Sequence, residues 1–408
     1  MGTGEAPNAH PPLSWSETEN IKWKTEIPGR GHSTPIVWDN LVFLIAAEPF
    51  GEQLEPKLSG RPGEHDNLPV SQRHRFLVIA INRDDGSIAW KKPVHEELPL
   101  EGAHYTASLT SASPVTDGQY LYAWLGSYGL YCLDFHGNIV WQKQLGKMHT
   151  KHGHGEGASP VLFEGTLVIN WDHEEESFIV AFESKTGEEI WRKQRAEVTS
   201  WSSPIVVEHA GVAQVIVAGT NRVRAYDIRN GNRIWECGGL SNNVVATPVA
   251  ADGMVVVGSS YEKRAMFGIK LEDASGDITG SRNVVWFTRE RTPYVPSPLL
   301  YDGTVYYLRH YQNVLSRRDL ATGTESLGPF RLQGLRDIYA SPVAANDRIY
   351  VTDREGVTIV FQHVDEQAAE TPRLLSANRI DDSVNASLAL VGNQIFIRGE
   401  KYLYCIEE

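Results

Sequence analysis

Three residues that can bind metals or transfer protons stand at alternate positions in His152-Gly-His154-Gly-Glu156. In an extended chain, alternate side chains point to the same side. Asp172 and His173 follow in the next connection of the same region. Imidazoles together with carboxylates suit Zn, Mn, Fe or Cu, whereas Ca needs more oxygen ligands. The pattern predicts a divalent metal site formed by His152, His154, Glu156 and His173, or else a polar, glycine-rich loop without a metal.

The same residues could also transfer protons without a metal. Glu156 or Asp172 could act as acid or base beside His173 or His310, and Arg354 is a further candidate catalytic residue. The sequence contains no G-x-S-x-G, P-loop or G-x-G-x-x-G motif, so a serine nucleophile is not supported. Whether the protein is an enzyme stays open at this point.

A short repeated pattern must position these residues. The stretch Ala181–Trp191 reads A-F-E-S-K-T-G-E-E-I-W, and related stretches occur at Ala80–Trp90 and Ala225–Trp235, with a version one residue shorter at Cys132–Trp141. The glycine supplies the positive φ of a tight hairpin turn. A unit this short cannot bury its own apolar face, so the copies must stack against one another.

A second marker divides the chain into repeats. Ser/Thr-Pro followed by alternating apolar residues and a turn recurs at intervals of 44 to 50 residues, apart from a first interval of 79 that indicates an insertion. The markers are Thr34-Pro35, Ser113-Pro114, Ser159-Pro160, Ser203-Pro204, Thr247-Pro248, Ser297-Pro298, Ser341-Pro342 and a degenerate Ser387-Leu388. Eight such repeats, each reading as four strands, predict an all-β, eight-bladed β-propeller with four-stranded antiparallel blades.

The two ends of the chain complement each other. The segment Leu13–Ile27 contains Trp23 and reads as the fourth strand of a blade, whereas Ser387–Ile406 reads as the first three. Together they would complete one blade and close the ring without open sheet edges. We therefore expect a tail at residues 1–12 and a single propeller domain at 13–408.

Strand direction places the longer connections on one face, which we call the mouth. Binding residues tend to lie on long loops, and the insertion at 48–75 in the first blade would lie over the mouth as a partial lid. Aromatic faces beside Asn, Asp and Arg suit sugars and cationic or planar ligands. The candidate ligand-binding residues are His32, His104, Tyr105, Trp171, Trp201, Asn243, Tyr261, Tyr294, Arg309, Tyr311 and Tyr339.

Composition narrows the classes of partner. The net charge is −13 and there is no Lys/Arg run, so we expect no nucleic-acid partner. No apolar run approaches the ~18 residues of a membrane-spanning helix, and the first residues do not read as a signal peptide. The three cysteines lie far apart and read as small buried apolar residues.

The repeated stretch resembles the tryptophan-docking repeat A-x-D-x-x-T-G-x-x-x-W of the PQQ (pyrroloquinoline quinone)-like propellers. Ala181–Trp191 carries Glu183 in place of the Asp, Ala225–Trp235 keeps Asp227, and Ala80–Trp90 has Asn at the same position. The resemblance covers essentially the whole chain. It implies a fold like that of the quinoprotein alcohol dehydrogenases, the BamB-type assembly lipoproteins and the stand-alone secreted PQQ-like repeat proteins, and a periplasmic or secreted location.

The chain departs from those families where their function lies. The dehydrogenases carry an adjacent cysteine pair over the quinone, and no two cysteines adjoin here, so we expect no PQQ. The lipidated N-terminal cysteine of BamB-type proteins is also missing. We expect a monomer that binds a small molecule, a carbohydrate or a protein at the mouth. The alternatives are a metal-assisted hydrolase or polysaccharide lyase, and an interaction scaffold of the outer-membrane assembly type.

Overall fold

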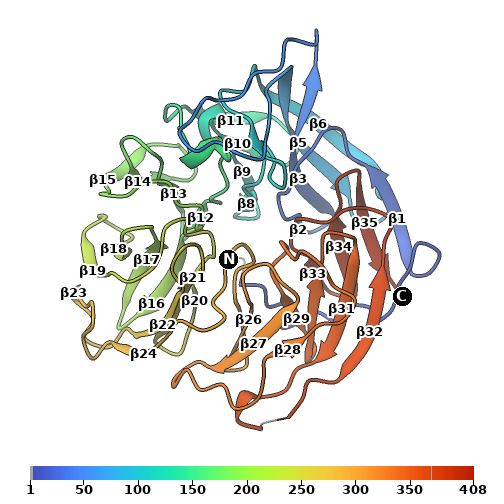
Figure 1. Ribbon diagram of the computed structural model, residues 1–408. Coiled ribbons are helices and arrows are strands. Elements are labelled where there is room, and N and C mark those ends of the chain that lie inside the picture. Colours follow the sequence, from blue (N-terminus) through green and yellow to red (C-terminus); the bar gives the residue numbers. More distant parts are fainter. Residues whose placement is uncertain (1–2, 369) are drawn as a thin grey trace.

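A computed structural model describes residues 3–368 and 370–408, and the chain forms a ring of eight β-sheets around a central axis (Figure 1). Each sheet has four antiparallel strands, and one gains β23 (Gly276–Asp277) as a parallel fifth strand. The predicted eight-bladed propeller is confirmed. The helices in the described residues are the single 3-10 turns η1 (Gly126–Tyr128), η2 (Lys151–Gly153) and η3 (Glu366–Ala368), and none of these could span a bilayer.

Seven blades run in chain order from the innermost to the outermost strand. The first two comprise β2 (Ile36–Trp38), β3 (Leu41–Phe50), β5 (Arg73–Asn82) and β6 (Ile88–Glu97), then β8 (Val115–Thr116), β9 (Tyr120–Trp124), β10 (Leu130–Asp134) and β11 (Ile139–Lys143). The next two comprise β12 (Val161–Phe163), β13 (Thr166–Trp171), β14 (Phe178–Glu183) and β15 (Glu189–Gln194), then β16 (Ile205–His209), β17 (Val212–Ala218), β18 (Val223–Asp227) and β19 (Arg233–Cys237). Three more comprise β20 (Val249–Ala251), β21 (Met254–Ser259), β22 (Ala265–Lys270) and β24 (Val284–Thr288), then β25 (Leu299–Tyr301), β26 (Thr304–Leu308), β27 (Val314–Asp319) and β28 (Phe330–Arg331), then β29 (Val343–Ala345), β30 (Arg348–Thr352), β31 (Val357–Gln362) and β32 (Leu374–Arg379).

The eighth blade joins the two ends of the chain. It contains β33 (Ala389–Val391), β34 (Gln394–Arg398) and β35 (Tyr402–Glu407), and β1 (Ile21–Glu26) adds its outermost strand. β1 pairs antiparallel with β35, with Trp23 opposite Cys405. This pairing confirms the prediction that the two ends of the chain complete one blade and close the ring.

The tryptophans of the repeat lie in outer strands and bond to the following blade. Five of the indole Nε1 groups donate to a backbone carbonyl there: Trp23 to Arg83, Trp90 to Phe135, Trp141 to Ser184, Trp191 to Ile228 and Trp286 to Leu320. The repeat glycine belongs to the same contact, because a Cβ on Gly187 (φ +69) would lie 2.8 Å from the Trp141 ring. The Thr-Gly turn and the Trp are therefore two halves of one joint between blades.

The Ser/Thr-Pro markers are linked from blade to blade. The backbone N–H before the proline donates to the marker hydroxyl of the next blade at 2.9–3.0 Å, from Thr34 to Ser113, Ser113 to Ser159, Ser159 to Ser203, Thr247 to Ser297, Ser297 to Ser341 and Ser341 to Ser387. The proline itself has no N–H to donate, so it can follow without loss of a ladder bond. This chain of bonds explains why the marker repeats with the blades.

The segment before β1 packs against the ring. Glu5 forms a parallel bridge with Ala344 of the inner strand β29, and the N–H of His10 donates to the carbonyl of Gly392. Trp15 is buried in the core of the last two blades. The described part of the expected tail thus crosses from the centre of the ring to the outermost strand β1 (Figure 1).

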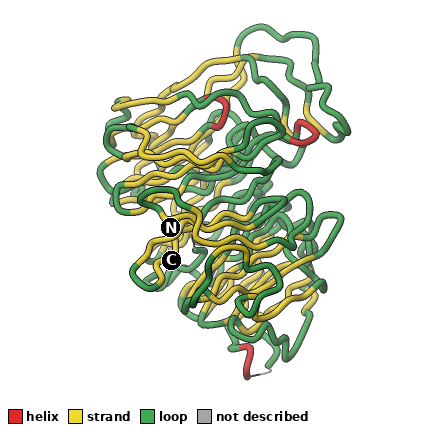
Figure 2. Tube along the Cα trace, turned by 90° about the vertical axis from the view of Figure 1, so that its left-hand side faces the viewer, coloured by secondary structure: helices red, strands yellow, loops and turns green. Residues whose placement is uncertain are grey.

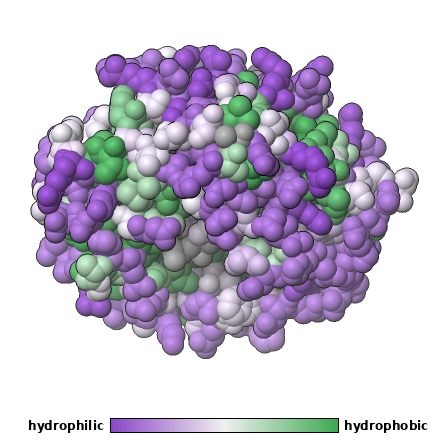
Figure 3. Space-filling model, turned by 90° about the horizontal axis from the view of Figure 1, so that it is seen from below, coloured by the Kyte–Doolittle hydropathy of each residue, from purple (hydrophilic) through white to green (hydrophobic). Residues whose placement is uncertain are grey.

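The insertion starts from two long strands, since β3 continues to Phe50 and β5 begins at Arg73. Within it, β4 (Asn67–Leu68) pairs antiparallel with β7 (Ala103–His104), which lies on the connection after the first blade. Figure 2 shows the ring from the side, with long loops extending beyond the strands. The view of Figure 3 shows mostly hydrophilic side chains with scattered hydrophobic ones.

Candidate functional site

Four tyrosines follow one another along one side of the mouth, and we call them the aromatic wall. They are Tyr261 between β21 and β22, Tyr294 between β24 and β25, Tyr311 between β26 and β27, and Tyr339 between β28 and β29. Successive ring centres lie 5.8, 6.5 and 5.6 Å apart. All four side chains are half-buried, so one part of each ring packs on the protein and another part faces solvent. His310 lies 4.5 Å from both Tyr294 and Tyr311 and fills the gap between them.

Cations lie at both ends of the aromatic wall. The Lys151 ammonium is 5.8 Å from the centre of the Tyr261 ring. At the other end, the Arg354 guanidinium lies 5.1 Å from Tyr339 and 5.7 Å from Tyr105, which is 50% exposed. These distances fit cation–π contacts.

A polar network adjoins Arg354 where the ring closes. Glu400 accepts hydrogen bonds from Arg30 Nε (3.0 Å) and Asn385 Nδ2 (3.1 Å) and lies 2.7 Å from His32 Nε2. Burial alone would raise the pKa of Glu400, but the bond to His32 and the charge of Arg30 outweigh it and hold this pKa at about 2. Glu400 is therefore an anion at neutral pH. Arg354 joins the network by donating from Nε to Asn385 Oδ1 at 3.0 Å.

Arg398 lies behind this network at the end of β34. Its side chain is 1% exposed, and its Nε donates to the carbonyl of Gly31 at 3.3 Å. The two terminal nitrogens of Arg398 are buried and have no hydrogen-bond partner among the described residues. Burial lowers the pKa of Arg398 to about 10, so the guanidinium is still charged at neutral pH.

Four histidines lie where the insertion meets the connections that follow the first and second blades, and we call them the histidine wall: His65, His104, His152 and His154. The ring of His154 lies 4.8 Å from His65, 4.9 Å from His104 and 5.3 Å from His152. Burial and the neighbouring imidazoles lower the pKa of His154 to about 4. Each Nδ1 lies within hydrogen-bond distance of an oxygen, on Gly63, Thr106, Pro62 and Asn67 respectively.

The predicted metal ligands lie in different surroundings. Glu156 accepts hydrogen bonds from Ser127 N (2.8 Å) and Ser127 Oγ (2.5 Å), away from the histidine wall. His173 is buried, with Nε2 3.2 Å from the carbonyl of Glu176. Within the described residues, no group of three or more His, Cys, Asp or Glu side chains is arranged to hold a metal ion. The predicted ligand set is not assembled in this structure, and metal binding stays a prediction.

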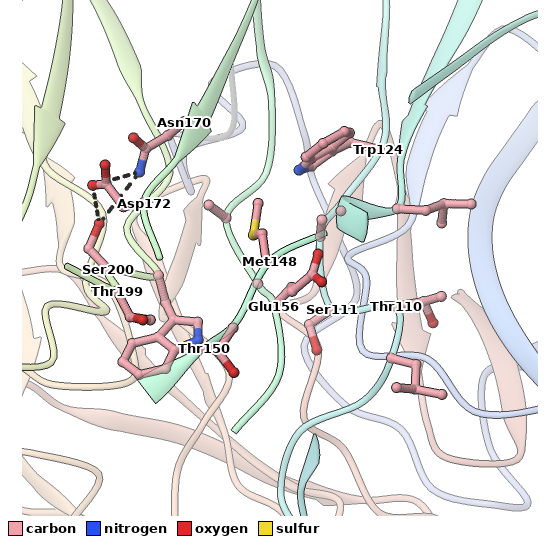
Figure 4. Close-up of a pocket in the computed structure, with 17 residues that line it drawn as sticks. Thr110, Ser111, Trp124, Met148, Thr150, Glu156, Asn170, Asp172, Thr199 and Ser200 are labelled. Atoms are coloured by element: carbon pink, nitrogen blue, oxygen red, sulfur yellow. Dashed lines mark hydrogen bonds between the residues drawn. The ribbon is translucent and has the colours of Figure 1, made fainter. Parts of the chain in front are cut away.

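A space between the β8–β11 and β12–β15 blades contains two of the candidate acid–base residues (Figure 4). It spans about 450 Å³ with open solvent included, and its enclosed part has room for little more than a water molecule. Figure 4 shows Glu156 on one side of it, while Asp172 and Ser200 lie on the other, bonded to each other at 2.6 Å. Burial raises the pKa of Glu156 to about 7. Asp172 instead forms a bidentate ion pair with Arg195 in which both side chains are fully buried.

The remaining candidates divide into buried and accessible residues. Trp171 is 2% exposed and packs between Trp124 and Phe178 in the core, and Asn243 is also buried. Trp201 is half-buried, and its indole donates to the carbonyl of Gly155 at 2.7 Å. The half-buried or exposed candidates are His104, Tyr105, Trp201, Tyr261, Tyr294, Arg309, His310, Tyr311, Tyr339 and Arg354. His32 is half-buried as a whole residue, but its imidazole is buried.

Sequence reasoning missed several residues that organise these regions. His65 and Asn67 lie in the insertion, which has no counterpart in the other repeats. Asn67 Nδ2 donates to the carbonyls of His152 and Gly153. Glu101 binds Arg61 of the insertion and accepts from Thr150. The position of Glu101 shortly after a predicted strand could have indicated a polar role. The spacing of the residues gave no indication of its partners Arg61 and Thr150.

The fold and the repeats define the protein as an eight-bladed propeller built from PQQ-like repeats. Residues 74–327 match the family model described as "Outer membrane protein assembly factor BamB", and the chain belongs to this family. The comparison with curated proteins gives no match.

Solved structures share the fold at low sequence identity. BamB from Moraxella catarrhalis is 13% identical, with a TM-score of 0.58 over 88% of this chain and 98% of that chain. The quinohemoprotein alcohol dehydrogenase from Comamonas testosteroni is 9% identical, with a TM-score of 0.63 over 96% of this chain and 78% of that one. The computationally designed Ika8 protein is 11% identical, with a TM-score of 0.60 over 93% and 98%. At these identities the likeness concerns the fold.

Proposed function

We propose that this protein is an extracytoplasmic propeller that binds a carbohydrate at its mouth without PQQ. The observation that carries the proposal is the aromatic wall, with its unbroken succession of half-buried rings between Lys151 and Arg354. Membership of the BamB family supports the extracytoplasmic part of the proposal.

Partial burial suits the rings to binding. A tyrosine whose ring is held on one side by the protein loses little side-chain freedom when a ligand covers the other side. The C–H-rich face of a sugar ring can pack on such a surface while its hydroxyl groups stay hydrated or bond to nearby polar side chains. A row of rings, rather than one isolated ring, favours an extended oligosaccharide over a compact small molecule.

The test is a glycan array probed with the labelled protein, followed by calorimetry with the oligosaccharide that binds best. Tyr311→Ala removes a central ring of the wall and should weaken binding at least tenfold. Tyr120→Ala, on the opposite face at the start of β9, is the matched control and should leave affinity unchanged. If no glycan binds, or if Tyr311→Ala binds like the wild type, the proposal is wrong.

A second candidate function is hydrolysis or cleavage of the bound saccharide, with Glu156 as the proton donor. The observation that favours it is the pKa of about 7, which leaves the carboxyl partly protonated at neutral pH. Glu156→Gln should abolish product formation while calorimetric affinity persists. Absence of product from the wild type with the bound oligosaccharide would leave the binding role alone.

Family membership favours one further alternative, an interaction scaffold of the outer-membrane assembly type. A scaffold would retain a protein partner in pull-downs and would not respond to glycans. Tyr311→Ala would then change partner capture or have no effect, whereas saccharide affinity would be absent from the start.

A further inference from the structure

We propose that the carbohydrate bound at the mouth is acidic, and that Arg354 binds its carboxylate with the buried Arg398 reinforcing the positive field. This inference rests on the proposed carbohydrate binding and adds the ligand's charge and the residues that recognise it. It concerns the end of the aromatic wall at Tyr339 and the adjoining network at the closing blade.

Arg354 has the geometry of a carboxylate receptor. Its Nε is fixed by Asn385 and its plane lies near the Tyr339 and Tyr105 rings, so the guanidinium is held in place. Among the described residues, its two terminal nitrogens make no hydrogen bond and no carboxylate pairs with it. A guanidinium offers two parallel N–H groups that match a carboxylate, and a side chain already held in position loses little freedom on binding.

The surrounding carboxylates are already engaged. Glu400 is bound by Arg30, His32 and Asn385. Asp382 accepts from the backbone N–H groups of Lys401 and Tyr402. Neither acid is in an ion pair with Arg354 or Arg398 in the described structure. Both carboxylates are therefore held by other groups and leave the Arg354 side chain free of an ion pair among the described residues.

Arg398 adds a buried positive charge at this end of the mouth. Its charge is buried, so its field is weakly screened by solvent. Arg398 is close enough to Glu400 and His32 to influence the pKa of His32, and both of these residues link to Arg354 through Asn385. We treat it as a positioning residue that favours an anion above it, without direct contact with the ligand.

The aromatic wall and Arg354 together define one ligand chemistry. A sugar ring stacked on Tyr339 or Tyr105 would place a substituent within reach of the guanidinium between them. A uronic acid carries both parts, the C–H-rich ring face and a carboxylate on the same ring. A neutral sugar would use only the tyrosines.

The experiment compares two oligosaccharides that differ only in charge, a tetramer of galacturonic acid and the same tetramer with its carboxyl groups reduced to alcohols. Calorimetry should give at least tenfold tighter binding of the acidic tetramer at low salt. Raising the salt concentration should shrink that ratio, because the charge contribution is screened. Arg354→Gln should bring the acidic tetramer down to the affinity of the neutral one and leave neutral binding unchanged.

Two variants complete the design. Arg229→Gln removes an exposed arginine from a turn on the opposite face and should keep the wild-type preference. Arg398→Met should lower the preference without changing neutral binding, and Arg354→Gln tests the proposal independently if Arg398→Met does not fold. Equal affinity for the two tetramers, with both lost in Tyr311→Ala, would overturn the acidic ligand and keep carbohydrate binding. Binding of neither tetramer overturns the inference, and the glycan array then decides the proposed function separately.

Discussion

The histidine wall and the aromatic wall face the same mouth, but their polar groups are bonded very differently. On the side of the insertion and the β8–β15 blades, Asp172 and Glu101 each accept at least two hydrogen bonds from other residues of the chain. At the end of the aromatic wall, the terminal nitrogens of Arg354 have no hydrogen-bond partner among the described residues.

This difference distinguishes residues that stabilise the structure from residues that can bind a ligand. Polar groups that satisfy one another hold the insertion and the blades in place, and they have little capacity left for a ligand. Groups that keep unused donors beside half-buried rings can gain bonds when a ligand arrives. The comparison predicts that substitutions near the histidine wall lower stability, while substitutions along the aromatic wall lower affinity and spare stability.

The largest effect should come from Asp172→Ala. It leaves Arg195 as a fully buried cation without its carboxylate, and loss of one partner of a buried pair costs about 3–5 kcal/mol of unfolding free energy. Urea denaturation measures the change. Arg192→Ala, which removes an exposed pair with Glu189, is the control and should cost less than about 1 kcal/mol. If Asp172→Ala loses no more unfolding free energy than Arg192→Ala, the residues near the histidine wall do not have the structural role given to them here.

Glu156→Gln should change how stability depends on pH. The folded-state pKa of about 7 lies above the ordinary glutamate pKa of 4.5, so the folded protein binds the proton more tightly than the unfolded chain. The wild type should therefore lose stability as pH rises from 4.5 to 7, by at most about 3 kcal/mol from this group. Urea titrations across that range should show a flatter profile for the variant. Parallel profiles for the two proteins would contradict the raised pKa.

Asn67→Ala should loosen the insertion and little else. It removes the bonds from Asn67 to His152, Gly153 and His154, at a local cost of about 1–3 kcal/mol. Hydrogen exchange should accelerate at β4 and β7, with global unfolding hardly changed. The control is Gln72→Ala, whose half-buried side chain bonds only to the carbonyl of Gly51 among the described residues. Equal exchange in both variants would show that Asn67 does not hold the insertion.

The sequence predicted the ring because its signals are local and repeated. The serine before most of the prolines accepts a bond from the preceding blade, and five of the repeat tryptophans bond to the following blade, so both patterns recur with the blades. The same logic placed Tyr294, Tyr311 and Tyr339 on the mouth, because each lies on a long connection after a regular strand.

The histidine wall could not be predicted in the same way. His65 lies in a unique insertion, and its contact with His154 depends on how that segment crosses the mouth. The pattern His152-x-His154-x-Glu156 assumed an extended chain, but His152 has a φ of +57 and lies in η2. That backbone breaks the alternation, which is why Glu156 turns to Ser127 instead. The burial of Arg398 is likewise a property of packing, which no spacing reveals.

The smallest expected effect is that of Tyr311→Phe on stability. The Tyr311 hydroxyl makes no hydrogen bond within the described residues, so its removal should change the unfolding free energy by less than about 0.5 kcal/mol. Tyr122→Phe is the matched comparison, because that hydroxyl belongs to a fully buried ring and donates to Asp117 at 2.8 Å, and its loss should cost about 1 kcal/mol. Urea denaturation of the two variants side by side measures the contrast. Equal losses of unfolding free energy would mean that the Tyr311 hydroxyl stabilises the fold. The aromatic wall would then contribute to stability, as the histidine wall does, and the distinction between the two walls would be wrong.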